Sequence, residues 1–499
     1  MGPKKSAPDA TASRRIVFFH PDLGIGGAER LIIDAAVGLQ ELGHKVTIFT
    51  SHCDPQHCFE EARDGTLDVR VRGNTIFPPT ILNRLHILLA ILRQIHLVLS
   101  VAFFGDELFQ IRPDVFIVDQ LSACVPLLRW ICSDRQRTLF YCHFPDQLLA
   151  DRKRGGIAGL VKAGYRLPFD WFEGWSTAAS DKIVVNSNFT RSIASKVIPA
   201  KGPLTVIYPC VSSDSRPAEL SDKPLWDGKF KLLLSVNRFE RKKDIGLALH
   251  AYNGLTEEER RGTRLILAGG YDSRVAENLQ YHQELVQMAE EMGLIAATVK
   301  TAPTALGISD DVEVLFMLSI PGAFKATLMS QATLLLYTPV NEHFGIVPVE
   351  AMQHGLPVLA SNTGGPLETV VEGETGWLRD ASKVEQWTQV MRTVLVSLSP
   401  KAFQQMKVAG QRRASENFTR VIMAKKFDAE IKAMLESKRS DFVERQQILM
   451  GVGLIAAVAA ALIATIVGAY AGKPVNRRTT DFARAKRTDT GRPSYMPVS

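Results

Sequence analysis

The stretch RIVFFHPDLGIGGAE at residues 15–29 decides the fold. Its uninterrupted apolar run, residues 16–19, predicts a buried β-strand. A turn containing three glycines follows, and residues 30–42 then repeat apolar side chains with helical spacing. A strand, a glycine-rich turn and a helix in this order form the opening unit of a nucleotide-type α/β domain. The turn alone is weak evidence for any particular ligand.

The alternation of strands and helices continues through the first half of the chain. Further strands are expected at residues 45–50, 114–118, 138–141, 182–185 and 205–207. Strands that alternate with helices imply a parallel sheet covered on both faces. The second strand ends in Thr50, Ser51 and His52 rather than in an acidic residue. Since a dinucleotide-binding domain needs an acid there for the ribose, the sequence argues against NAD.

A second domain of the same kind follows a polar, proline-bearing linker at residues 210–228. Its strands are expected at residues 230–236, 264–268, 312–316, 332–337 and 357–360, and helices at 244–252 and 278–291. The predicted fold class is α/β, with two doubly wound Rossmann-like domains, residues 15–209 and 229–399, that face a cleft. Charged C-terminal helices are expected over residues 400–445.

Length and charge limit the function classes. The chain has 499 residues, 46% of them apolar and 22% charged, as an ordinary folded protein does. Its net charge of +7 is concentrated in two tails, because residues 1–15 carry +3 and residues 473–499 carry +5. The intervening residues therefore sum to −1, and we expect no nucleic-acid partner. Residues 1–14 are predicted to be a disordered basic tail, and residues 473–499 a second basic tail.

The cysteines favour a reducing compartment. Six of them are too few for a disulfide scaffold in a chain of this length. Cys53 and Cys58 resemble a zinc-binding pair, but no second pair accompanies them, so reduced thiols are the favoured interpretation. The first apolar run, residues 16–19, is too short for a signal peptide. Both features favour the cytosolic side of any membrane.

Two segments are candidates for contact with a membrane. Residues 448–472 contain no charge over 25 positions, which is long enough to cross the hydrocarbon core, and a membrane helix is predicted there. Residues 81–104 are also apolar but include two arginines and two histidines. Most polar positions of that segment fall on one arc of a helix. A helix in the membrane interface and an ordinary surface helix of the fold remain equal alternatives for it.

The most informative motif is E-x7-E, formed by Glu342 and Glu350. It follows the strand expected at residues 332–337 and enters a helix predicted to begin near Pro348. A helix entry offers free backbone donors and the positive end of the helix dipole, which suit a phosphate or sugar hydroxyls. The amides concerned are those of Gly345, Ile346 and Val347.

Glu350 is expected in the first helical turn, where its carboxylate can accept hydrogen bonds from both hydroxyls of a ribose. A carboxylate that only caps a surface helix is the structural alternative. The glycine turns that follow, at residue 355 and at residues 364–365, disfavour that alternative.

Three further residues follow expected strands, where ligands bind in doubly wound domains. Arg238 and Lys243 come after the first strand of the second domain and can neutralise a diphosphate leaving group. His143 comes after the strand at residues 138–141 and can contact the transferred group. The chain contains no Asp-x-Asp pair for a divalent metal. We therefore predict metal-independent transfer that needs no cofactor.

Together these features resemble the family 4 retaining glycosyltransferases of the GT-B fold. The resemblance rests on E-x7-E, on the spacing of Arg238 and Lys243, on the GGAE turn and on His143, and it covers about residues 15–440. It implies an N-terminal acceptor domain and a C-terminal domain that binds a nucleotide sugar.

Three longer stretches resemble one branch of that family, the mannosyltransferases that build the dolichol-linked N-glycan precursor. They are HPDLGIGGAERLIIDAA, YCHFPDQLLA and SVNRFERKKDIGLAL. The branch implies GDP-mannose as donor and Man1GlcNAc2- and Man2GlcNAc2-diphosphodolichol as acceptors, linked α1,3 and then α1,6. It also implies membrane lipid and other mannosyltransferases of the pathway as partners, and the cytosolic face of the endoplasmic reticulum membrane as location.

The resemblance assigns roles in donor binding. Glu350 would bind the ribose hydroxyls, and Glu342 would hold the donor sugar and phosphate together with the amides of residues 345–347. Arg238 and Lys243 would hold the diphosphate, with the neighbouring Lys242 as an alternative lysine.

The remaining roles concern transfer itself. His143 would contact the mannose near its reacting carbon, and Gly26 and Gly27 would let a phosphate or the acceptor approach the backbone. The expected catalytic set is His143, Lys243, Arg238 and Glu342. No covalent nucleophile is evident, so the hypothesis is same-face attack with the donor phosphate as base.

Two alternatives remain open. One is another lipid-linked sugar transferase of the same fold that uses UDP-N-acetylglucosamine, and the other is a membrane-tethered binding protein without catalysis. The orientation is also open, because the basic tail after residue 472 favours a cytosolic C-terminus, which with a single span would place the catalytic domains in the lumen. Glycan at the sequons Asn188 or Asn417 would reveal a luminal catalytic domain.

Overall fold

The computed structural model describes residues 13–81, 85–132, 135–149, 157–200, 202–211 and 223–439, together with residue 453. Contacts group the chain into two units, residues 1–444 and 445–499, and every element named below lies in the first. The expected membrane helix at 448–472, apart from residue 453, and the expected tails, apart from residues 13–14, lie outside the described residues.

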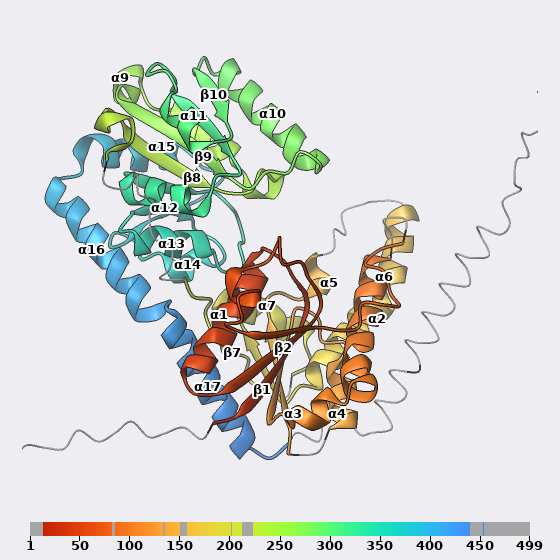
Figure 1. The fold of residues 1–499 in the computed structure, drawn as a ribbon. Coiled ribbons are helices and arrows are strands. Elements are labelled where there is room, and N and C mark those ends of the chain that lie inside the picture. Colours follow the sequence, from red (N-terminus) through yellow and green to blue (C-terminus); the bar gives the residue numbers. More distant parts are fainter. Residues whose placement is uncertain are drawn as a thin grey trace, which may run out of the picture. The chain divides into compact units, whose positions relative to one another are not determined.

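The first half of the chain builds a parallel seven-stranded sheet with the order β3-β2-β1-β4-β5-β6-β7 (Figure 1). Its strands are β1 (Arg15–Leu23), β2 (Lys45–Cys53), β3 (Asp68–Val71), β4 (Val115–Asp119), β5 (Arg137–Cys142), β6 (Lys182–Val185) and β7 (Thr205–Val206). In β1, residues 16–19 are buried, as their apolar run predicts. The predicted doubly wound architecture of this half is confirmed.

Helices surround this sheet. They are α1 (Gly27–Glu41), α2 (His86–Leu99), α3 (Glu107–Ile111), α4 (Val125–Ile131), α5 (Asp146–Leu149), α6 (Ile157–Ala178) and α7 (Asn188–Val197). A short 3-10 turn, η1 (Glu60–Ala62), and a π-helical turn, η2 (Ser100–Phe104), complete the half, and η2 directly continues α2.

The second half builds another parallel seven-stranded sheet, with the order β10-β11-β9-β8-β12-β13-β14. Its strands are β8 (Lys231–Val236), β9 (Thr263–Gly269), β10 (Ala296–Val299), β11 (Val314–Leu318), β12 (Leu334–Tyr337), β13 (Val358–Ser361) and β14 (Gly376–Arg379). Its helices are α8 (Gly246–Asn253), α9 (Glu257–Arg260), α10 (Ala276–Glu291), α11 (Ala302–Leu306), α12 (Gly322–Gln331), α13 (Ile346–Gln353), α14 (Pro366–Thr369) and α15 (Val384–Arg392). The shorter turns are η4 (Leu225–Gly228), η5 (Arg241–Lys243) and η6 (Thr393–Ser397).

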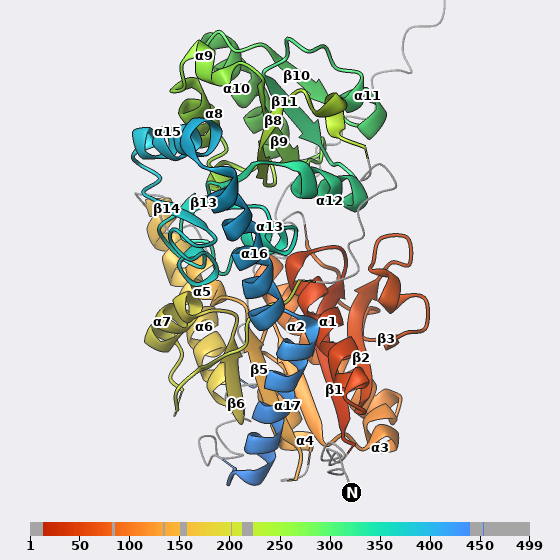
Figure 2. The ribbon, with the colours of Figure 1, turned by 90° about the vertical axis from the view of Figure 1, so that its left-hand side faces the viewer.

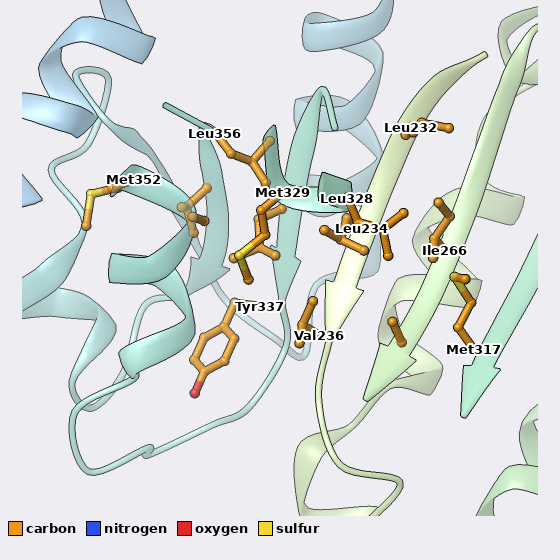
Figure 3. Packing of buried hydrophobic residues seen from close by; sticks show 14 of the residues in the cluster. Leu232, Leu234, Val236, Ile266, Met317, Leu328, Met329, Tyr337, Met352 and Leu356 are labelled. Carbon is orange, nitrogen blue, oxygen red and sulfur yellow. The ribbon is translucent and has the colours of Figure 1, made fainter. Parts of the chain in front are cut away.

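The run LLL in β8 explains why this sheet needs helices on both faces. Side chains alternate across a strand, so Leu232 and Leu234 enter one apolar core while Leu233 enters the other. Figure 3 shows the first of these cores, in which Leu328 and Met329 of α12 lie over the strand residues. Burial on both faces is characteristic of parallel sheets.

Helices α16 and α17, which follow β14 and α15, pack on different halves of the molecule (Figure 2). Helix α16 (Pro400–Asn417) packs on α13, and its Gly410 lies against Met352. Helix α17 (Arg420–Glu436) packs on α1, and its Phe427 enters the core of the first domain. The helical stretch expected at residues 400–445 therefore divides its described part between the two domains.

Sequence analysis does not predict three of the strands, namely β3, β10 and β14. All three lie at sheet edges, where strands are short and often polar. Their sequences, DVRV, AATV and GWLR, lack the continuous apolar run that marks the central strands.

Polar side chains of α2 contact other residues of the first domain. Arg93 forms a bidentate ion pair with Asp22, with nitrogen–oxygen distances of 2.9 and 2.6 Å. Gln94 is buried, donates to the Leu121 carbonyl and accepts from the Cys124 amide. The segment 86–104 is long and apolar enough to cross a membrane, and half of its most apolar window is buried in the fold. Two polar residues of the arc, Arg93 and Gln94, thus have partners inside the domain, which favours a helix of the fold.

Candidate active site

Each sheet has one point where the strand order reverses direction, and a separate ion pair lies at each of these two points. In the first sheet the point lies between β1 and β4, and in the second between β8 and β12. Ligands of doubly wound domains bind outside the carboxyl ends of the strands at such points. The residues predicted for the site follow these strands or their neighbours.

At the second switch point, Lys243 and Glu342 form an ion pair. The Lys243 Nζ lies 2.5 Å from Glu342 Oε2, and both side chains are partly accessible. Thr338, just after β12, donates to the Lys243 carbonyl and so fixes the η5 turn. Burial alone would raise the pKa of Glu342, but the Lys243 ammonium, with smaller contributions from His343 and Tyr337, lowers that pKa. A lysine and an ionised carboxylate at this edge can exchange their mutual contact for a phosphate and sugar hydroxyls.

The neighbouring Lys242 has a different environment. Its side chain is 72% exposed and pairs with Glu240, whereas that of Lys243 is 17% exposed. Arg238 is also largely exposed, with its nearest carboxylate oxygen, from Glu240, 3.5 Å away. The geometry therefore favours Lys243 over Lys242 as the lysine beside E-x7-E and leaves the Arg238 guanidinium accessible to an anion.

Glycines shape the loop between Glu342 and α13. Gly345 has a φ of 81°, a left-handed conformation that other residues adopt only with strain. A side chain at Gly365 would place its Cβ 2.1 Å from the Phe344 carbonyl oxygen, and the Gly365 amide donates to the Glu342 carbonyl. The later glycine pair thus allows two backbone segments to touch, which holds the loop in place.

Helix α13 begins at Ile346, two residues earlier than predicted. Glu350 therefore lies in the second helical turn, and the expectation of the first turn is wrong. The first amides of a helix have no acceptor within it, so those of Ile346 and Val347 remain suited to an anion. The Glu350 carboxylate is bound by Lys325 of α12, with distances of 2.9 and 3.0 Å. A ribose would share or displace this lysine.

At the first switch point, Asp119 lies between two histidines. His20 of β1 places Nδ1 2.8 Å from Asp119 Oδ1, and His143, after β5, places Nε2 3.0 Å from Asp119 Oδ2. His20 and Asp119 are almost completely buried, whereas the side chain of His143 is 19% exposed. Only His143 of the three can therefore meet a ligand.

The turn that carries His143 touches the E-x7-E loop. The ring of Phe144 stacks on that of His343, with centroids 3.9 Å apart and planes 6° apart. The Ser187 hydroxyl, at the start of α7, donates to the His343 carbonyl. Burial and the nearby Lys243 lower the pKa of His343 to about 4, which leaves its ring neutral near pH 7. The structure thus brings His143, Lys243 and Glu342 into one region.

Gly26 caps the start of α1 in an extended conformation, and Gly27 is the first residue of the helix, three residues before the start predicted at residue 30. The Glu29 carboxylate lies over this end of the helix: a Cβ at Gly26 would be 2.2 Å from its Oε2. An approaching phosphate would have to displace that carboxylate.

Sequence analysis missed His20, Asp119 and Lys325. Asp119 directly follows the strand expected at residues 114–118, so its place at a strand end was an available signal. Lys325 gives no such signal, because only the tertiary fold brings α12 beside α13. Within the described part of the chain, no cluster of three or more His, Cys, Asp or Glu residues could hold a metal ion. Metal-independent transfer remains a prediction.

Comparison with known proteins gives the family. The model of Glycosyltransferase Family 4 matches residues 25–215, and that of Glycosyl transferases group 1 matches residues 218–407. The chain is 50% identical over 470 residues to the alpha-1,3/1,6-mannosyltransferase of Neurospora crassa, covering 92% of this chain and 98% of that protein. The chain belongs to the alpha-1,3/1,6-mannosyltransferase family. The Schizosaccharomyces pombe member is 46% identical over 431 residues, with coverages of 85% and 81%.

Solved structures agree with the fold of this mannosyltransferase family member. Sucrose-phosphate synthase from Thermosynechococcus elongatus superimposes with a TM-score of 0.63 at 18% identity, covering 84% of this chain and 99% of that one. Anabaena HepE, solved with UDP and glucose, superimposes with a TM-score of 0.60 at 18% identity, covering 84% and 100%. At these identities the likeness shows the two-domain fold alone.

Proposed function

We propose that this glycosyltransferase moves mannose from GDP-mannose to Man1GlcNAc2-diphosphodolichol and then to Man2GlcNAc2-diphosphodolichol. The first linkage would be α1,3 and the second α1,6, both with retention of configuration. The observation that carries the proposal is the Lys243–Glu342 pair, which lies at a sheet switch point beside the start of α13. The curated relatives named above are alpha-1,3/1,6-mannosyltransferases, which supports mannose as the transferred sugar.

The donor would lie across the second switch point. Lys243 and Arg238 would neutralise the diphosphate, and the amides of residues 345–347 would donate to a phosphate or the sugar. Glu342 would accept from the mannose hydroxyls, and Glu350 from those of the ribose. His143 would contact the mannose from the first domain. Fixed charges of this kind stabilise the departing diphosphate most strongly as its charge develops.

The acceptor's lipid requires a membrane surface. We place this enzyme at the endoplasmic reticulum membrane, with its catalytic domains on the cytosolic side, where its cysteines would stay reduced. All six cysteines are free thiols in the structure. Large apolar side chains are exposed on the segments around α2, namely Phe103, Phe104, Phe109 and Trp130. Such side chains suit a domain that contacts the lipid of a membrane surface.

The donor test uses the full-length protein in phospholipid vesicles that contain Man1GlcNAc2-diphosphodolichol. With GDP-mannose we expect the acceptor to gain two mannoses in sequence. With UDP-N-acetylglucosamine we expect no transfer. Transfer from the UDP-sugar in place of GDP-mannose would support the alternative transferase, and no transfer from either would contradict an enzymatic role.

The orientation test concerns the two sequons. The Asn188 side chain donates to Tyr208 and Glu368, whereas Asn417 lies on an exposed helix end. Asn417 is therefore the more informative site, and we expect it to carry no glycan in cells. A glycan at Asn417 would place the catalytic domains in the lumen and contradict the proposal.

A further inference from the structure

Three titratable side chains, two buried and one partly exposed, are joined by hydrogen bonds at the first switch point. Asp119 Oδ1 and Oδ2 lie 2.8 and 3.0 Å from His20 Nδ1, and Oδ2 lies 3.0 Å from His143 Nε2. Asp119 is 1% exposed and His20 is 0% exposed. The three residues come from β1, from the end of β4 and from the turn after β5. Neighbouring strands therefore hold all three at one edge of the sheet.

The hydrogen bonds of His20 determine its protonation. Its Nδ1 faces the Asp119 carboxylate, and its Nε2 lies 3.2 Å from the carbonyl oxygen of Asp22. Because both partners only accept hydrogen bonds, both ring nitrogens must carry protons. Burial alone would lower the pKa of His20, but Asp119, with smaller contributions from Glu29 and the Asp22 carbonyl, raises that pKa. The two acceptors thus favour an imidazolium at His20, which balances the charge of Asp119.

The Asp119 carboxylate also determines which ring nitrogen of His143 carries a proton. Since Asp119 accepts at His143 Nε2, that nitrogen carries a proton. In the neutral ring, Nδ1 then has a lone pair and can only accept a hydrogen bond. Within the described residues, no hydrogen bond is made to His143 Nδ1.

We propose that Asp119, balanced by His20, is a positioning residue that holds His143 in its Nε2–H form, so that Nδ1 accepts a hydrogen bond from a sugar hydroxyl in the transfer step. The inference rests on the proposed function, in which His143 contacts the mannose. Asp119 itself touches no substrate and acts through His143.

A purely structural role explains this arrangement less well. Buried ion pairs add little stability compared with apolar residues of similar volume, because removing charges from water is costly. The strands that carry these residues otherwise bury apolar side chains, such as Phe19 and Val118. Branched aliphatic residues would pack there at no such cost, yet the sequence places three polar groups that end at a partly exposed ring.

The central variant is Asp119→Asn, which keeps the volume of the side chain. Its amide can donate to His143 Nε2, which would move the ring proton to Nδ1 and turn the acceptor into a donor. We expect kcat for mannose transfer by the full-length enzyme in acceptor vesicles to fall by about 10–100-fold. The KM for GDP-mannose should change far less, because all the donor contacts proposed above except that of His143 lie on the other domain.

A double-mutant comparison separates positioning from structure. In the background of His143→Ala, Asp119→Asn should lower kcat no further, since it acts through the missing ring. A matched control is Asp34→Asn, which alters another buried carboxylate, paired with Arg30 in α1. That control should lower the Tm without lowering kcat of the folded enzyme.

Each outcome decides a different claim. If the wild type transfers no mannose, the proposed function fails before Asp119 is tested. If His143→Ala is as active as wild type, or if Asp119→Asn is fully active or lowers kcat equally in both backgrounds, the inference is overturned. Should Asp119→Asn fail to fold, His20→Gln takes its place, because without the imidazolium a proton on His143 Nδ1 would have to balance Asp119, and the ring would lose its acceptor. That variant should lower kcat only when His143 is present, and equal losses with and without His143 would overturn the inference.

Discussion

The two sheet switch points carry ion pairs of opposite character. At the second, Lys243 and Glu342 are 17% and 23% exposed, so a ligand can replace their mutual contact. At the first, His20 and Asp119 are 0% and 1% exposed, so no ligand can reach them. The same position in two similar folds therefore serves two purposes. In our proposal the accessible pair binds the donor, and the buried pair can act only through a third residue, His143.

The largest expected effect breaks the accessible pair. Lys243→Ala should lower kcat/KM for mannose transfer by at least about 100-fold, because it removes the charge that faces the diphosphate and leaves Glu342 unpaired. Lys242→Ala is the matched control, with the same substitution one residue earlier on an exposed side chain. Steady-state transfer assays would check both variants. A greater loss for Lys242→Ala than for Lys243→Ala would show that Lys242, not Lys243, has this role.

A smaller effect is expected at the ribose end of the same region. Glu350→Gln should raise the KM for GDP-mannose by about 10-fold, since hydrogen bonds to a charged group contribute about 1.5–3 kcal/mol. Lys325→Met should raise it by less than about 5-fold, because a partly exposed ion pair contributes at most about 1 kcal/mol. Initial rates against donor concentration measure both. An unchanged KM in Glu350→Gln would remove Glu350 from the donor site.

A separate effect, on stability rather than on transfer, concerns pH and the turn behind His143. Glu173 accepts hydrogen bonds from the Asp146 and Gln147 amides, and burial raises its pKa from 4.5 to about 7. Between these values the unfolded chain loses the proton while the folded chain keeps it. The contribution of Glu173 to stability therefore falls as pH rises from about 4.5 to 7, by about 1–3 kcal/mol, and is constant above that range.

Thermal unfolding of wild type and Glu173→Gln at several pH values tests this sign. Any stability advantage of the wild type should shrink between pH 5 and 7 and then stay level. A gap that widens with pH would mean that Glu173 is ionised in the folded protein below pH 5.

Sequence alone predicts the parts of this comparison that depend on local pattern. The central strands are continuous apolar runs, and E-x7-E, Arg238 and Lys243 follow them directly, so both the architecture and the second region could be anticipated. The edge strands β3, β10 and β14 could not, because exposure to solvent removes the apolar signal.

The first region was only partly predictable for a different reason. His143 stands at a strand end, but its partners His20 and Asp119 are 99 residues apart in the sequence. Only the parallel pairing of β1 with β4 brings them together. The choice between Lys242 and Lys243 likewise depends on which side chain the η5 turn directs toward Glu342, and residue types alone do not contain that information.

The most direct test of the contrast is the dissociation constant of GDP-mannose, measured by calorimetry on the full-length protein. Lys243→Ala should weaken donor binding by at least about 10-fold, because it removes a charge-assisted contact. Asp119→Asn should bind the donor as wild type does, although it transfers mannose slowly. Normal binding by Lys243→Ala together with lost binding by Asp119→Asn would contradict this assignment of the two regions.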